Sequence, residues 1–99
     1  MDRLPDLETY RVDALDKGYD EVLERRWAAG AVTGTHSHPF DVAAVLVEGE
    51  MWLEQGPIVV HLVPGSEFEL KANAPHAERY GPDGAMFFSA RRHSMQLSA

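Results

Sequence analysis

The chain has 99 residues, which is enough for one domain with a small core and too short for two. It contains no cysteine, so disulfides, thiolate metal ligands and thiol nucleophiles are excluded. Sixteen acidic residues against nine basic ones leave a net charge of −7, which disfavours binding to a nucleic-acid backbone.

The start of the chain is charged and lacks an apolar core, since Asp2, Arg3, Asp6 and Glu8 all lie before Tyr10. We therefore expect no signal peptide. The longest apolar run, 42–47, is far shorter than the roughly 20 residues that a membrane span needs. These features predict a cytoplasmic protein that binds neither membrane nor nucleic acid.

Short apolar or alternating segments are separated by turns that contain glycine and proline. The first segment, 7–15, is largely polar and predicts an edge strand that ends at the turn Asp16-Lys17-Gly18. The continuous apolar run 42–47 predicts a strand covered on both faces. The other predicted strands are 21–29, 51–54, 58–63, 76–80 and 85–91, and 51–54 forms a hairpin with 58–63. This pattern has no helical periodicity and predicts an all-β sandwich or barrel.

Alternation along a strand predicts which side chains share a face. His36 and His38 are separated by one residue, so they point the same way and can share one metal ion. If they face the barrel interior, Val42, Ala44 and Leu46 point inward, whereas Asp41, Ala43, Val45 and Val47 point outward. An apolar outer face needs cover in water, from another strand or another subunit. The resulting prediction is a homodimer.

Glycines and histidines between residues 30 and 80 follow the spacing of two motifs. The residues in register are Gly30, His36, His38 and Gly49 for the first motif, and Gly65 and His76 for the second. The pattern resembles the two motifs of the cupin superfamily. This resemblance implies a cupin-type double-stranded β-helix, or jelly-roll barrel, as a single domain over 1–99, with motif 1 at 30–49 and motif 2 at 65–80. Val42 stands where the family has Glu, and Tyr80 stands where it has Asn.

The resemblance implies a divalent transition-metal ion held by three histidines, His36, His38 and His76. Neutral imidazole binds several such ions, and the sequence does not choose among Fe, Zn, Ni, Mn and Cu. Because Val42 replaces the family's carboxylate, the charge of the ion is left uncompensated and coordination positions stay open. This arrangement favours an anionic substrate or a metal-bound hydroxide over a passive closed site.

Glu78 lies two residues after His76 and shares its face, so it is a candidate catalytic residue. Its role is open among a general base, a partner that orients a histidine, and a solvated carboxylate. Asp41 adjoins the lost ligand position but points the other way by strand parity. Either carboxylate could replace the missing ligand. Three aromatic residues are expected to line the ligand pocket: Trp27, Phe40 and Tyr80.

The remaining histidines and the arginine pairs are predicted chiefly as surface residues. His61 is expected to face outward, and His93 to lie in the tail after the last strand. Arg25-Arg26 and Arg91-Arg92 lie in predicted strands, so the two residues of each pair point to opposite faces of the sheet. These arginines are expected to be solvated or ion-paired on the surface. The alternative is that one of them points inward and anchors an anionic ligand.

Two function classes follow. The first is a metal-dependent enzyme of the dioxygenase, isomerase or lyase type that acts on a small organic molecule, including an anionic one. The second is a non-catalytic ligand-binding or sensory module that acts through a partner. The spacing of the histidines predicts the pocket and leaves the reaction open.

Overall fold

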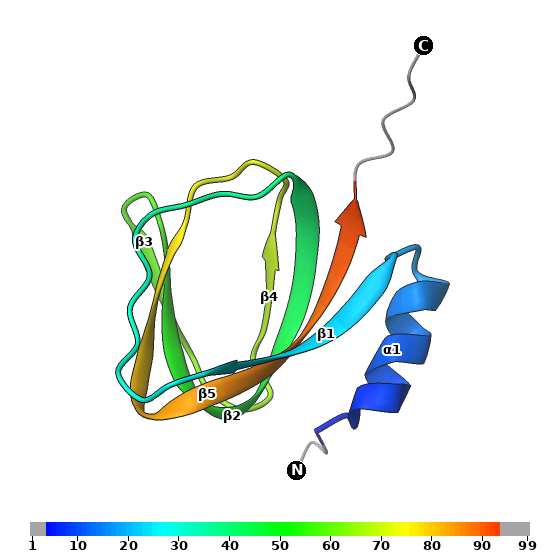
Figure 1. Cartoon of the computed structure of the whole chain (residues 1–99), viewed down its shortest axis with the longest axis horizontal. Coiled ribbons are helices and arrows are strands. Elements are labelled where there is room, and N and C mark those ends of the chain that lie inside the picture. Colours follow the sequence, from blue (N-terminus) through cyan, green and yellow to red (C-terminus); the bar gives the residue numbers. More distant parts are fainter. Residues whose placement is uncertain (1–3, 94–99) are drawn as a thin grey trace.

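The computed structural model describes residues 4–93, which form one helix and a five-stranded antiparallel sheet curled into a barrel (Figure 1). The elements in chain order are α1 (Leu7–Asp16), β1 (Glu21–Trp27), β2 (Phe40–Gln55), β3 (Ile58–Leu62), β4 (Glu67–Leu70) and β5 (Ala77–His93). The strand order is β1-β5-β2-β3, and β4 pairs with β2. The predicted all-β barrel is confirmed. The ends of the predicted domain, 1–3 and 94–99, lie outside the described residues.

Two long strands, β2 and β5, carry the curvature of the barrel. They pair with each other from Phe40–His93 to Glu54–Ala77, with register shifts on both sides of Glu48-Gly49. Such shifts bend a strand and increase its twist, so each long strand contributes to two walls. The sequence predicted each of them as two short strands, and this was wrong. The glycine-containing breaks are bulges within continuous ladders, because pairing resumes on either side of them.

The barrel interior holds the main hydrophobic core, in which Leu46 and Met51 are completely buried. Val42 and Ala44 point into the same core as Leu46, as strand parity predicted. The other buried members are Leu53, Leu62, Leu70, Tyr80, Ala85 and Phe87. Side chains of the same parity on β1 and β5 therefore face this interior as well.

The segment 7–15 was predicted as an edge strand, and the structure corrects this to helix α1. Asp6 caps the helix, because its carboxylate accepts a hydrogen bond from the backbone N–H of Thr9 at 2.7 Å. This bond holds the pKa of Asp6 below its usual value. Leu7, Tyr10 and Ala14 recur at helical spacing and pack against β1 and β5.

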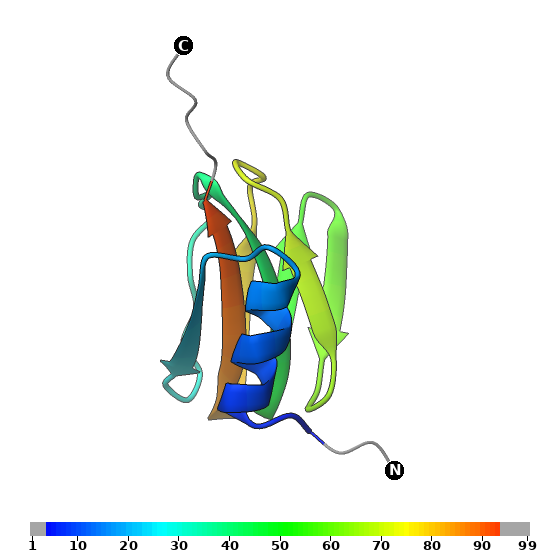
Figure 2. The same cartoon turned by 90° about the vertical axis from the view of Figure 1, so that its right-hand side faces the viewer.

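Helix α1 lies against the outer face of the sheet, in front of it in Figure 2. It covers the apolar outer residues that the sequence predicted, since Val45 is buried beneath Leu7 and Tyr10. The chain itself therefore supplies the cover that was expected from another strand or subunit. The homodimer stays a prediction with less support from this face.

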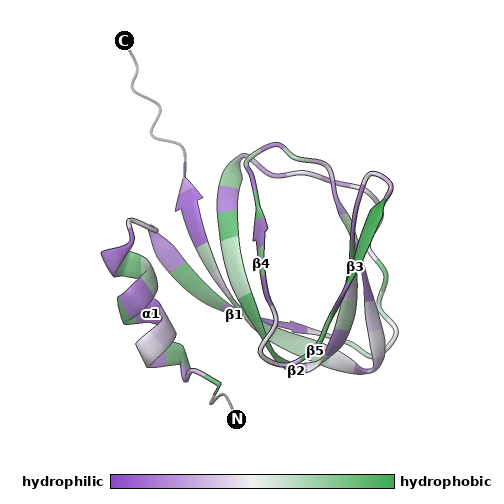
Figure 3. Cartoon of the chain, turned by 180° about the vertical axis from the view of Figure 1, so that it is seen from behind, coloured by the Kyte–Doolittle hydropathy of each residue, from purple (hydrophilic) through white to green (hydrophobic). Residues whose placement is uncertain are grey.

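Strand β3 lies at an edge of the sheet and carries a run of hydrophobic residues (Figure 3). Ile58 is 62% exposed and Val59 is 51% exposed. Its one strand partner among residues 4–93 is β2. If a homodimer forms, this edge offers more uncovered apolar area than the face under α1.

The two histidines outside the motifs differ in their outcomes. His61 is exposed, as predicted, and its Nε2 lies 2.7 Å from the Glu50 carboxylate. His93 was predicted in the tail, but it is the last residue of β5. Its backbone N–H donates to Asp20 at 2.6 Å and its Nε2 lies 2.9 Å from Glu21, so two side chains near the start of β1 hold it in the sheet.

Replacing Tyr10 with Phe should destabilise the protein by about 1 kcal/mol, because the Tyr10 hydroxyl donates to the Ala43 carbonyl at 2.8 Å. Burial raises the pKa of this hydroxyl from 10.0 to about 12. Its contribution is therefore fully present below pH 10 and is lost as the pH rises through about 12. Urea unfolding of wild type and variant should show a stability gap that narrows over this range. If the difference in free energy of unfolding does not change with pH, the Tyr10 hydroxyl does not stabilise the protein through this hydrogen bond.

Candidate metal centre

The histidines of the two motifs meet at one end of the chain's long β5 strand. His36 lies in the segment between β1 and β2, and His76 immediately precedes β5. The two residues form an isolated antiparallel bridge, in which each backbone N–H donates to the other's carbonyl at 2.9 Å. Their ring centroids are 4.4 Å apart. The fold thus returns His76 beside the first motif.

Backbone carbonyls orient all three motif histidines in the same way. Nδ1 lies 2.7 Å from the Gly34 carbonyl in His36, 3.1 Å from that of Phe40 in His38, and 2.9 Å from that of Ala74 in His76. A carbonyl oxygen only accepts, so each Nδ1 carries the proton. In the neutral ring Nε2 then keeps its lone pair, which is the tautomer suited to a metal ligand.

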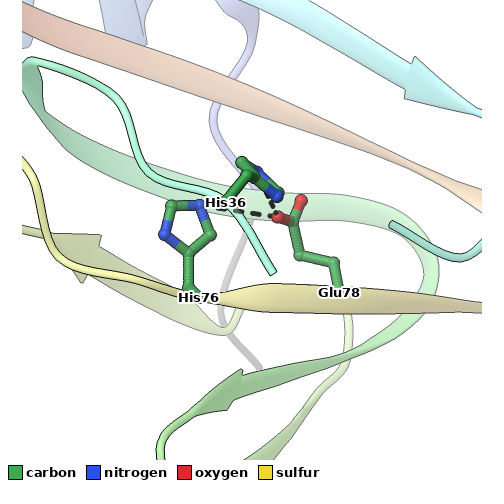
Figure 4. Close-up of side chains that lie close together, drawn as sticks. All are labelled: His36, His76 and Glu78. Atoms are coloured by element: carbon green, nitrogen blue, oxygen red, sulfur yellow. Dashed lines mark ion pairs between the residues drawn. The ribbon is translucent and has the colours of Figure 1, made fainter. Parts of the chain in front are cut away.

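Glu78 completes a cluster with His36 and His76 (Figure 4). One carboxylate oxygen, Oε2, is 3.3 Å from His36 Nε2 and 3.6 Å from His76 Nε2. The other, Oε1, accepts a hydrogen bond from the Tyr80 hydroxyl at 2.6 Å. Oε2 is buried and has no hydrogen-bond partner.

These distances fit a divalent metal ion. Two ligand atoms bound at ~2.1 Å in a tetrahedral arrangement are about 3.4 Å apart. The potential ligand atoms of the three residues all lie within 4.8 Å of one another. Each is a lone-pair acceptor when the histidines are neutral, and acceptors with no proton between them repel unless a cation lies among them. The cluster is therefore suited to hold a cation.

His38 stands beside this cluster and is not one of its three residues. Its ring stacks on Phe40 with centroids 4.3 Å apart, and it lies 4.9 Å from the His76 ring and 6.5 Å from the His36 ring. Burial lowers the pKa of His38, which favours the neutral ring. The predicted set of three histidines is thus not the set that the structure brings closest together, and His38 as a ligand stays a prediction.

The lost carboxylate of the first motif has a substitute in the second. Val42 is a core residue, as its apolar side chain requires. Asp41 accepts a hydrogen bond from the Ala72 N–H at 2.8 Å and pairs with Arg92 at 3.2 Å, and the Ala72 bond holds its pKa below the usual range. Asp41 is therefore used elsewhere. Glu78 is the carboxylate that the fold brings to the two histidines, His36 and His76.

Of the three residues predicted to line a ligand pocket, Tyr80 contacts the cluster directly, through Glu78. Tyr80 is buried and stacks on Trp27, with ring centroids 4.9 Å apart. Burial, with the neighbouring Glu78, raises the pKa of Tyr80, so its hydroxyl keeps the proton that it donates to Glu78. Phe40 lies against His38. Trp27 and Phe40 thus contact the neighbours of the cluster, Tyr80 and His38.

Thr33 was missed in the sequence, although it helps to hold Glu78. Its backbone N–H donates to the Glu78 carbonyl at 2.9 Å, and its hydroxyl oxygen accepts from the Glu78 N–H at 2.9 Å. The available signal was antiparallel pairing: once His36 is placed opposite His76, Thr33 falls near Glu78.

A groove with a volume of about 1290 Å³ lies elsewhere, between α1 and β4. Its lining includes Tyr10, Ala43 and Phe68 and contains no histidine. Size therefore does not identify the site. The convergence of titratable groups does.

No described helix has the length and apolar character needed to cross a membrane. No protein-family model matches the chain, and no curated protein does. Several solved structures are similar to it.

An uncharacterised Klebsiella pneumoniae protein with a double-stranded β-helix domain has a TM-score of 0.63 and 26% identity, over 72% of this chain and 64% of that one. A chain from the crystal structures of the DMSP lyases RdDddP and RnDddQII has a TM-score of 0.68 and 25% identity, over 79% and 40%. An RmlC-like cupin from Shewanella frigidimarina has a TM-score of 0.62 and 20% identity, over 77% and 69%. The matched region thus spans less than two thirds of the first two proteins.

Three observations indicate the same fold: the barrel topology, the spacing of the motif glycines and histidines, and these similar structures. The chain therefore has the cupin-type double-stranded β-helix fold.

Proposed function

We propose that the chain binds one divalent transition-metal ion through His36, His76 and Glu78 and acts as a metal-dependent enzyme on a small organic molecule. One observation supports this above the others: Glu78 Oε2 is buried, has no hydrogen-bond partner, and faces the Nε2 atoms of two histidines whose Nδ1 atoms are already bonded. A bound cation would satisfy all three atoms.

Two nitrogen ligands and one oxygen ligand suit Fe, Zn, Ni, Mn or Cu, with selection set by geometry and availability. When bound, such an ion would act as a Lewis acid toward a substrate oxygen or lower the pKa of a bound water. Three protein ligands leave positions open for substrate. The similarity to proteins named as DMSP lyases supports an enzyme, although the matched region covers 40% of that lyase chain.

The side chains around the cluster have separate parts in this proposal. Tyr80 donates to Glu78 Oε1 and so directs Oε2 toward the histidines. Carbonyls of Gly34 and Ala74 fix the histidine tautomers. Trp27 packs on Tyr80 and Phe40 packs on His38, so the two aromatic rings support neighbours of the cluster.

The competing explanation is a proton in place of the metal ion. A protonated His36, whose side chain is 42% exposed, would form an ordinary ion pair with Glu78. That explanation predicts no affinity for transition metals. Metal analysis therefore separates the two explanations directly.

Metal content should be measured by mass spectrometry after the protein is stripped with chelator and reloaded. We expect about one ion per wild-type chain and none in the double variant His36→Ala/His76→Ala. The matched control, His61→Ala/His93→Ala, removes two histidines outside the cluster and should load like wild type. Equal loading of all three proteins, or no loading of wild type with any of the five metals, would refute the proposal.

A further inference from the structure

Two arginines face the barrel interior, where Arg25 lies over the ring of Trp27 and Arg91 over the ring of Phe40. In antiparallel strands, residues directly opposite each other point to the same face. Arg25 is opposite Phe87, and Arg91 is opposite Val42, and both partners belong to the interior core. Of the two alternatives that the sequence left open for the arginine pairs, this parity favours the inward one.

Arg91 is held in place but incompletely paired. Its guanidinium carbon lies 4.6 Å from the centre of the Phe40 ring, and its side chain is 24% exposed. Its Nε is buried and has no hydrogen-bond partner. The nearest carboxylate, Glu21, is 3.9 Å away and also contacts His93 at 2.9 Å. A buried N–H on a charged group without a partner is costly, and the partly exposed guanidinium is the part of this side chain that an acceptor from outside the chain can reach.

Arg25 adds a second positive charge on the same side. Its guanidinium carbon lies 5.5 Å from the Trp27 ring centre, and within residues 4–93 no carboxylate lies within 4.0 Å of it. Burial lowers the pKa of Arg91, and repulsion by the charge of Arg25 lowers it further. An anion between them would relieve this repulsion.

The arginines next to them in sequence, Arg26 and Arg92, point outward and are paired with carboxylates. Arg26 lies 3.6 Å from Glu24 and 3.4 Å from Glu48, and Arg92 lies 3.2 Å from Asp41. The chain carries a net charge of −7, so carboxylates are available to pair with arginine. The inward arginines are thus the ones left with free donors.

We propose that Arg25 and Arg91 bind the carboxylate of a small organic acid, whose other end reaches the cluster of His36, His76 and Glu78. The part played by the cluster rests on the proposed function, whereas the anion site does not. A guanidinium presents donors in a planar fork that matches a carboxylate. Phe40 and Trp27, on which the two guanidinium groups lie, would enclose the carbon chain of the acid.

Nuclear magnetic resonance titration of the full chain tests this with succinate as the probe and its neutral diamide as control. Succinate should shift the Arg91 Nε–H signal of the metal-free wild type, and the diamide should not. The double variant Arg25→Gln/Arg91→Gln should bind succinate about 100-fold more weakly. The matched double variant Arg26→Gln/Arg92→Gln should bind it within about 2-fold of wild type. Inorganic phosphate serves as the third probe.

The outcomes separate the anion site from the metal site. If wild type loads metal but Arg25→Gln/Arg91→Gln binds succinate as tightly as wild type does, the anion site is overturned and the proposed function is left intact. Arginine-dependent succinate binding without metal loading supports the anion site and removes the proposed function. Binding of phosphate but not succinate overturns the assignment to a carboxylate. If the double glutamine variant does not fold, an unmoved Arg91 Nε–H signal in wild type overturns the proposal by itself.

Discussion

Glu78→Gln is expected to weaken metal binding at least about 100-fold. The substitution keeps the size of the side chain and removes its negative charge. It also replaces one carboxylate oxygen by an NH₂ group, which donates hydrogen bonds and cannot coordinate a metal ion. That group would occupy the space near His36 Nε2 and His76 Nε2, where Oε2 now lies at 3.3 and 3.6 Å.

The same substitution should stabilise the metal-free protein. In wild type, Oε2 is a buried acceptor without a partner, and this costs free energy. The glutamine NH₂ would instead donate to the lone pairs of the two histidines. We therefore expect the metal-free variant to unfold at a higher temperature than metal-free wild type, and the order to reverse when metal is added.

Competition with a chelator of known affinity measures the metal affinity, and thermal unfolding with and without metal measures the stability. Glu50→Gln is the matched control, because Glu50 also contacts a histidine, His61 at 2.7 Å, but at an exposed position. It should change neither quantity appreciably. If Glu78→Gln binds metal as tightly as wild type, Glu78 is not a ligand.

Gly49→Ala should destabilise the protein by about 3–5 kcal/mol, a large part of the stability of a domain of this size. Gly49 has a φ of +78°, which side chains with a Cβ rarely adopt. A Cβ at this position would lie 2.0 Å from the Gly84 carbonyl oxygen and 2.9 Å from the Ala85 Cα. Both atoms belong to the backbone, so a side-chain rotation cannot relieve the clash.

Gly30→Ala is the control for this prediction. Gly30 has a similar φ of +67°, but no atom lies within 4 Å of the position that its Cβ would take. Backbone strain alone should cost about 1–2 kcal/mol there. Urea unfolding followed by tryptophan fluorescence gives both values. Equal losses in the two variants would mean that strain at positive φ, and not the approach of β2 to β5, explains the effect at Gly49.

Motif spacing placed Gly30 and Gly49 correctly, but it did not show why a glycine is needed at each position. Both were placed in register from spacing alone. The spacing does not indicate that Gly49 meets the backbone of β5, because that contact joins segments 35 residues apart in the chain. A similar limit applies to α1. Its polar composition with few apolar residues is compatible with a strand or a helix, and packing of Tyr10 on β2 and β5 adds stability that no local pattern records.

Strand parity and motif spacing by themselves determined which residues share the barrel interior, since the alternation of side chains is a property of each strand. Val42 was expected in that interior on this ground, and Glu78 was expected on the same face as His76. Only the tertiary structure decided which atoms converge. His38 has the right parity, yet it stacks on Phe40, whereas Glu78 has its Oε2 directed at two histidines by Tyr80. Convergence depends on how distant segments bend toward one another, and a one-dimensional period does not contain that information.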